Sequence, residues 1–124
     1  MIRVPHPLFI LGYVLTMAIV IVLSLMPAPT LPGPEGSDKA AHLLAYGAIA
    51  FCGGLGFRSW ELRILSGSSA LGLGVLLEIA QAAWFDRNGS VWDAASNSMG
   101  GVLGLLAAEL ILFMFKKQSR PAAS

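Results

Sequence analysis

Four long apolar segments, separated by short stretches rich in proline, glycine or charge, constrain this chain more than any other feature. They span about residues 8–26, 40–57, 64–85 and 94–115. A helix needs about 20 residues to cross the hydrocarbon core of a bilayer. With 56% hydrophobic and 12% charged residues, a soluble domain of 124 residues lacks the interior to bury so much apolar surface. We therefore expect one all-α membrane domain with four transmembrane helices in a compact bundle.

The segments between the apolar runs carry typical helix-breaking and turn residues. Residues 26–38 read MPAPTLPGPEGSD, which cannot continue a helix because of its prolines and glycines. Residues 58–63, RSWELR, are expected to form a tight charged turn, and residues 86–93, DRNGSVWD, a polar loop. After the last run, residues 116–124 are expected to form a short, basic, flexible tail.

The first apolar segment has an alternative interpretation as a cleaved signal peptide, since Arg3 precedes it and Ala28 follows it. Its apolar run exceeds the usual 7–15-residue core of a signal peptide, and Pro29 makes Ala28 a poor cleavage point. A retained transmembrane helix is therefore favoured.

The distribution of Lys and Arg predicts the orientation in the membrane. With four spans, one side carries Arg3, Arg58, Arg63, Lys116, Lys117 and Arg120, and the other carries only Lys39 and Arg87. Positive residues favour the cytoplasm, so both termini are expected there. Trp84 and Trp92 are then expected at the outer membrane interface and Trp60 at the inner one.

Polar residues gather in the outer halves of the last three predicted spans. Asp38, His42 and Tyr46 recur at i, i+4 and i+8 and therefore share one helix face. Asp93 and Asn97 share a face of the last helix, and Glu78 and Gln81 share one of the third. Ionisable groups within a bilayer are costly and usually face protein or a wet cavity. This pattern predicts a polar cavity that opens outward and narrows toward Glu78.

Each of these residues also has a purely structural interpretation. Ser37 or Asp38 can cap the second helix and Asp93 the fourth, Tyr46 can be packing, and Lys39 and Arg87 can be interfacial cations. Glu109 is expected to be structural, snorkelling or paired near the cytoplasmic side, on the same face as Lys116. Small residues on the third and fourth helices suggest close helix packing: Gly67, Gly72, Gly74, Gly100, Gly101 and Gly104.

In these motifs the sequence resembles the VanZ-like family of small bacterial membrane proteins. The matching residues are Asp38, Lys39, His42 and Tyr46, then Glu78 and Gln81, then Arg87, Ser90, Asp93, Asn97 and Gly100. Leu43 stands where the family usually has an aromatic residue, and Asp86 where it often has Gly. The resemblance implies a multi-pass protein of the bacterial inner membrane with a role in the cell envelope. The family is named for teicoplanin resistance, and its kinship to membrane enzymes of lipid head groups has been suggested.

The favoured hypothesis is a site that acts on or binds a phosphate- or glycan-bearing lipid head group. His42 would be the general base or, less favourably, the nucleophile, because an ordinary histidine pKa lies near working pH. Glu78 or Asp93 would orient it or act as the second acid or base, and Lys39 and Arg87 would hold phosphate. The remaining residues assigned to binding are Asp38, Tyr46, Gln81, Ser90 and Asn97.

Two other functions stay open at this point. A non-catalytic binder or scaffold for lipid-linked cell-wall precursors would use the same cavity without proton transfer. An ion-coupled transporter is less favoured for two reasons. All the ionisable residues of the predicted spans except Glu109 lie in the outer half, which leaves no evident path through the inner leaflet. In addition, a protein of four helices would have to oligomerise. No metal site or cofactor is expected, since one intramembrane His with these carboxylates is not a recognisable ligand set. Nucleic acid is not an expected partner, whereas a membrane lipid and homo- or hetero-oligomers are.

Overall fold

The computed structural model describes residues 6–25, 37–84 and 91–120, except for the side chains of Ser37, Asp38, Trp84 and Val91. Within these ranges the chain is entirely helical apart from short turns. The helices are α1 (His6–Leu25), α2 (Ser37–Gly56), α3 (Trp60–Trp84) and α4 (Val91–Gln118). The predicted all-α class is confirmed.

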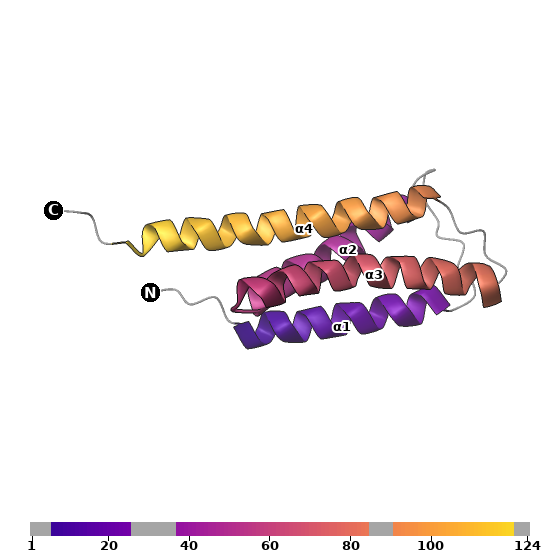
Figure 1. Cartoon of the computed structure of the whole chain (residues 1–124), viewed down its shortest axis with the longest axis horizontal. Helices are drawn as coiled ribbons and strands as arrows, with labels where there is room; N and C mark the ends of the chain where they lie inside the picture. Colours follow the sequence, from indigo (N-terminus) through magenta and orange to yellow (C-terminus); the bar gives the residue numbers. More distant parts are fainter. Residues whose placement is uncertain (1–5, 26–36, 85–90, 121–124) are drawn as a thin grey trace.

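Successive helices run in opposite directions along one long axis (Figure 1). We call the end that holds His6, Gly56, Trp60 and Gln118 the terminal end, because α1 begins and α4 finishes there. The far end holds Leu25, Ser37, Trp84 and Val91. Both α2 and α4 therefore begin at the far end and run parallel to each other.

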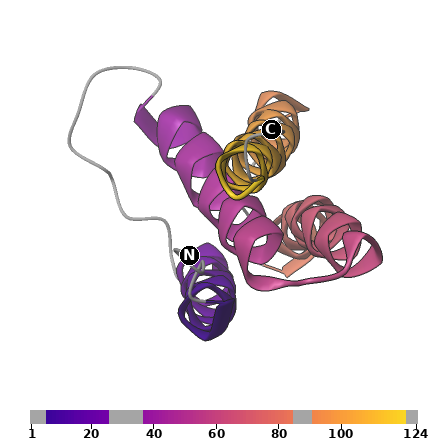
Figure 2. The ribbon, with the colours of Figure 1, turned by 90° about the vertical axis from the view of Figure 1, so that its left-hand side faces the viewer.

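α2 is the central helix of the bundle. It packs against each of the other three helices, whereas α1 and α4, which are both fully within the described ranges, make no close contact with each other. Viewed along the bundle, α2 crosses obliquely between α1 and α4, with α3 alongside (Figure 2). Side chains on α2 can therefore meet partners on any of the other three helices.

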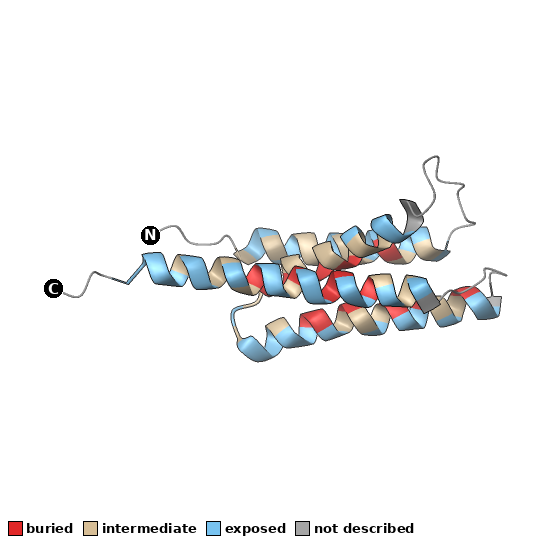
Figure 3. Ribbon diagram, turned by 90° about the horizontal axis from the view of Figure 1, so that it is seen from above, coloured by how far each residue is buried: buried red, intermediate tan, exposed pale blue. Residues whose placement is uncertain are grey.

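The distribution of side chains is that of a membrane protein. Among the described residues, three helices are long and apolar enough to cross a membrane, namely His6–Leu25, Trp60–Ala83 and Trp92–Gln118. Large apolar residues such as Val22 and Leu106 are exposed, as are many others along α1, α3 and α4. Exposed positions recur along the length of the helices (Figure 3). Polar Ser66, Gln81 and Asn97 are buried instead. Apolar groups outside and polar groups inside suit a lipid environment rather than water.

α2 does not reach the apolar character of the other three helices. Its first two turns carry Lys39 and His42, and its last turns carry Gly53, Gly54 and Gly56. Three of the four helices therefore have the length and composition of a membrane span, and the expectation of four spans stays a prediction.

A line of small residues brings α2 and α4 into backbone contact. A side chain added at Gly100 would collide with the carbonyl oxygen of Leu43, and one added at Gly104 with the carbonyl oxygen of Gly47. One turn further on, Ala108 packs against Gly54, where an added Cβ would lie 2.6 Å from the Ala108 Cβ. Small residues spaced by four let membrane helices approach closely. The tightest packing therefore joins α4 to α2, whereas Gly72 of α3 faces open space.

The helix bounds differ from the prediction at two places. Residues 58–63 were expected to be a turn, but α3 begins at Trp60, because the Ser59 Oγ accepts the Leu62 N–H at 3.2 Å and caps the helix. The predicted helix was defined by its apolar run, and the charged residues of the first turn of α3 precede that run, so they were not predicted to be helical. α4 begins at Val91 and continues to Gln118, so Lys116 and Lys117 belong to its last turn, where cations favour the helix dipole.

Candidate functional site

The predicted site residues that the structure describes lie toward the far end of the bundle. His42 and Tyr46 lie in the second and third turns of α2, Asn97 in the second turn of α4, and Glu78 and Gln81 in the last turns of α3. Because α2 and α4 run parallel and α3 runs against them, these turns lie at similar depth. The predicted convergence of polar positions on one end of the bundle is therefore present in the fold.

His42 and Asn97 form the central contact of this region. The Nδ1 of His42 lies 2.9 Å from the Oδ1 of Asn97, and a hydrogen bond joins them across the α2–α4 interface. His42 is half-buried, while Asn97 is only 3% exposed. The Gly100–Leu43 packing one turn deeper sets this spacing, because it draws the two helix backbones together.

Tyr46 lies beneath His42 and forms part of the core rather than a reachable binding group. Its ring is parallel to that of His42 within 6°, with the ring centroids 6.4 Å apart. The side chain is only 2% exposed and packs in one cluster with Val20, Ile49 and Leu77. The structural interpretation of Tyr46 is thus the one that the burial supports.

Glu78 and Gln81, which the sequence predicts on one face of α3, have different surroundings. The Glu78 carboxylate lies near enough to the Tyr46 hydroxyl for the two to interact electrostatically. The Gln81 side chain, only 8% exposed, donates its Nε2–H to the backbone carbonyl of Ser24 at 2.9 Å. The last turn of a helix has carbonyls without intrahelical partners, so Gln81 secures the end of α1.

Asp93 lies in the first turn of α4, one turn before Asn97 and on the same face. Its Oδ1 is buried and has no hydrogen-bond partner among the described residues. A buried carboxylate oxygen without a partner is costly. This oxygen is therefore a candidate to receive a proton or a hydrogen-bond donor from a bound molecule.

The remaining predicted site residues are less defined. Lys39 is exposed in the first turn of α2. Asp38 belongs to the same turn, but its side chain is outside the described part of the chain. Arg87 and Ser90 also lie outside the described residues. Over the part that the structure describes, no group of three or more His, Cys, Asp or Glu side chains could hold a metal ion.

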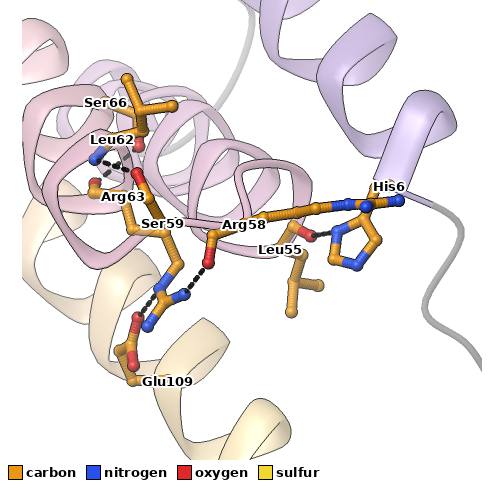
Figure 4. Close-up of polar contacts among 8 residues, drawn as sticks. All are labelled: His6, Leu55, Arg58, Ser59, Leu62, Arg63, Ser66 and Glu109. Atoms are coloured by element: carbon orange, nitrogen blue, oxygen red, sulfur yellow. Dashed lines mark hydrogen bonds and ion pairs between the residues drawn. The ribbon is translucent and has the colours of Figure 1, made fainter.

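A second polar cluster, at the terminal end, was not anticipated as a unit (Figure 4). The Arg63 Nε–H donates to the Glu109 Oε1 at 2.7 Å, and its Nη1 donates to the Arg58 carbonyl at 2.9 Å. The guanidinium also lies 5.6 Å from the centre of the Trp60 ring. Glu109 was expected to be structural, and its partner is Arg63 of α3.

His6 is a further residue that the sequence pattern did not single out. Its Nδ1–H donates to the Leu55 carbonyl at 2.9 Å, which ties the start of α1 to the end of α2 (Figure 4). Deeper in the bundle, the Tyr13 hydroxyl lies 2.6 Å from the Ser69 Oγ and links α1 to α3. The Ser69 Oγ in turn donates to the Ser66 carbonyl. These contacts stabilise the helix arrangement at a distance from His42.

Comparison with known proteins adds no further assignment. Neither a family model, nor a curated protein, nor a solved structure matches the chain. The resemblance to the VanZ-like family stays a prediction from the motif residues.

Proposed function

We propose that this chain is a multi-pass membrane protein whose far end acts on a phosphate- or glycan-bearing lipid head group, with His42 as general base. The observation that carries the proposal is the 2.9 Å hydrogen bond between His42 and Asn97, formed inside a bundle whose outer surface is apolar. A half-buried imidazole with one nitrogen held by a buried amide suits proton transfer at a membrane surface.

In the proposed topology all four helices span the membrane and both termini are cytoplasmic. α2 tolerates its lower hydropathy because it packs against the three other helices and so exposes less surface to lipid. Among the described residues, the cations of the terminal end support this orientation, namely Arg58, Arg63, Lys116, Lys117 and Arg120, against Lys39 at the far end. Exposed Trp60 and Trp92 lie at opposite ends, as membrane-interface residues do. The far end then faces outward from the inner membrane of a bacterial cell.

The chemistry proposed for this site uses the groups that a head group could reach. The Nε2 of His42 accepts a proton from the attacking water or hydroxyl, and Asp93 or Glu78, in its protonated form, donates a proton to the leaving oxygen. The imidazolium then releases its proton to water and the carboxylate takes one up, which restores both groups. Lys39, exposed in the first turn of α2, is placed to attract phosphate oxygens. Tyr46 supports the site by packing in the core beneath His42. Gln81 supports it by donating a hydrogen bond to the Ser24 carbonyl of α1. Arg87 and Ser90 keep their proposed binding roles on sequence grounds.

The proposal is tested by comparing membrane lipids from cells that produce the wild-type chain, His42→Ala or His42→Gln. A catalyst converts one head-group species in wild-type cells, and that species persists with both variants. Glu109→Gln, at the other end of the bundle, is the matched control and should behave as wild type. Identical lipid profiles for wild type and stably inserted His42→Ala would show that His42 catalyses no such reaction. Full retention of function in His42→Gln would instead favour a non-catalytic binder of a lipid-linked precursor.

A further inference from the structure

We infer that Asn97 is a positioning residue that fixes the proton of the neutral His42 ring on Nδ1, so that Nε2 carries the lone pair. The inference rests on the proposed function for its chemical purpose, but the tautomer can be measured without any substrate. At the sequence level, Glu78 or Asp93 was expected to orient His42, and the hydrogen bond in the structure comes from Asn97.

The direction of the hydrogen bond follows from the atoms that form it. The Oδ1 of an asparagine has lone pairs and no hydrogen, so it can only accept. The His42 Nδ1, 2.9 Å away, must therefore carry the hydrogen. In a neutral imidazole one nitrogen is a donor and the other an acceptor. A proton held on Nδ1 thus leaves Nε2 as the basic atom.

The packing around Asn97 holds its amide in place. The side chain is 3% exposed and lies against Gly74 of α3. A Cβ added at Gly74 would approach the Asn97 Nδ2 and the Tyr46 Cε1 to 3.2 Å each. Glycine at position 74 therefore provides the space that lets Asn97 lie between α2 and α3.

An amide also suits this position better than a carboxylate would. Burial of an ionised group in an apolar interior costs far more than burial of a hydrogen-bonded neutral one. Asn97 is almost fully buried, so a neutral acceptor orients the ring without adding a charge to the interior. Asp93 lies one turn nearer the far end, and its buried Oδ1, which has no hydrogen-bond partner among the described residues, can accept a hydrogen bond from another group.

The test is ¹⁵N NMR of histidine-labelled protein in nanodiscs, at a pH well above the ordinary histidine pKa of about 6.5. Only His6 and His42 contribute signals, and His6→Gln assigns them. The inference predicts a protonated Nδ1 and an unprotonated Nε2 for His42 in the wild type. Asn97→Ala, which removes the acceptor, should abolish this preference. The His6 signals, set by the Leu55 carbonyl, should not change in this variant.

A pair of glycine variants tests the same contact without changing either partner. In Gly74→Ala the added methyl group contacts the Asn97 amide, so this variant should reduce the preference for a proton on Nδ1. In Gly72→Ala the added methyl group lies in open space, so this variant should leave the preference unchanged. A wild-type His42 that carries its proton on Nε2 would overturn the inference. So would an unchanged His42 spectrum in both Asn97→Ala and Gly74→Ala.

The outcomes separate this inference from the proposed function. If the tautomer is as inferred but cells show no His42-dependent lipid change, the head-group reaction fails and the positioning by Asn97 stands. If lipid conversion requires His42 but the ring has no preferred tautomer, the reaction stands and the role of Asn97 is wrong.

Discussion

Arg63 and Glu109 form an ion pair with a 2.7 Å Nε–Oε1 distance that joins α3 to α4 at the terminal end. At the far end, the hydrogen bond between His42 and Asn97 joins α2 to the same helix. The two contacts thus hold α4 against its neighbours at two positions along its length. One pairs opposite charges beside a tryptophan, and the other places a titratable ring against a neutral amide.

We predict that Glu109→Gln lowers the free energy of unfolding by about 1–3 kcal/mol. The Arg63 and Glu109 side chains are only 18% and 27% exposed, so solvent screens the pair incompletely. Denaturation in detergent micelles measures the change. Lys116→Gln is the matched control, because Lys116 is exposed beyond the pair, and its effect should stay within about 0.5 kcal/mol. Equal decreases in the free energy of unfolding for the two variants would show that the Arg63–Glu109 ion pair does not stabilise the protein.

Gly104→Ala should lower the free energy of unfolding by about 1–3 kcal/mol, because the new methyl group meets the Gly47 carbonyl and forces α2 and α4 apart. Gly72→Ala adds the same methyl group where nothing lies within 4 Å. It should instead stabilise α3 by up to about 1 kcal/mol, since alanine is the better helix former. The two variants are compared in the same micelles. Similar effects of both substitutions would exclude a tight α2–α4 contact at Gly104.

Gln81→Met should lower the free energy of unfolding by about 1 kcal/mol, because it leaves the Ser24 carbonyl without its side-chain donor. The substitution keeps a long side chain, so the lost hydrogen bond is the main change. The His42 ¹⁵N signals should stay as in the wild type, which separates a role in holding α1 from a role in the site. A changed His42 tautomer with unaltered stability would instead place Gln81 in the site.

The proposed orientation predicts opposite labelling of two introduced cysteines in a Cys52→Ala background. Lys39→Cys at the far end should react with a membrane-impermeant thiol reagent in intact cells. Ser119→Cys, exposed just after α4, should react only after the membrane is opened. Labelling of both positions from the same side would rule out four spans, and the reverse pattern would invert the topology.

The sequence predicted the helices well, because apolar length and helix-breaking residues are local properties. Spacing also predicted that His42 and Asn97 lie on inward faces toward one end. The sequence did not predict which side chain contacts His42. A glycine indicates that another helix can approach at that position, but it does not indicate which helix does so. Whether Asn97 meets His42 depends on the packing of Gly100 against Leu43, two residues from different helices.

Gln81 and Arg63 are two further residues whose tertiary contacts the sequence did not predict. Gln81 was assigned to the cavity because it shares a face with Glu78, yet it meets the Ser24 carbonyl of α1. No residue pattern indicates that a backbone carbonyl lies opposite a side chain. Arg63 was counted in a turn because of its charge, while its partner Glu109 lies on another helix. Tertiary contacts of this kind follow from the relative rotation of helices, which a single sequence does not give.

Native mass spectrometry of the protein released from membranes tests the central claim, a head-group site at the far end, most directly. The wild-type chain should retain a lipid with a phosphate or glycan head group, and His42→Leu should lose that lipid while staying folded. Glu109→Gln, altered at the terminal end, should retain it as the wild type does. Loss of the lipid from Glu109→Gln and not from His42→Leu, or equal retention by all three, would contradict a site built around His42 and Asn97.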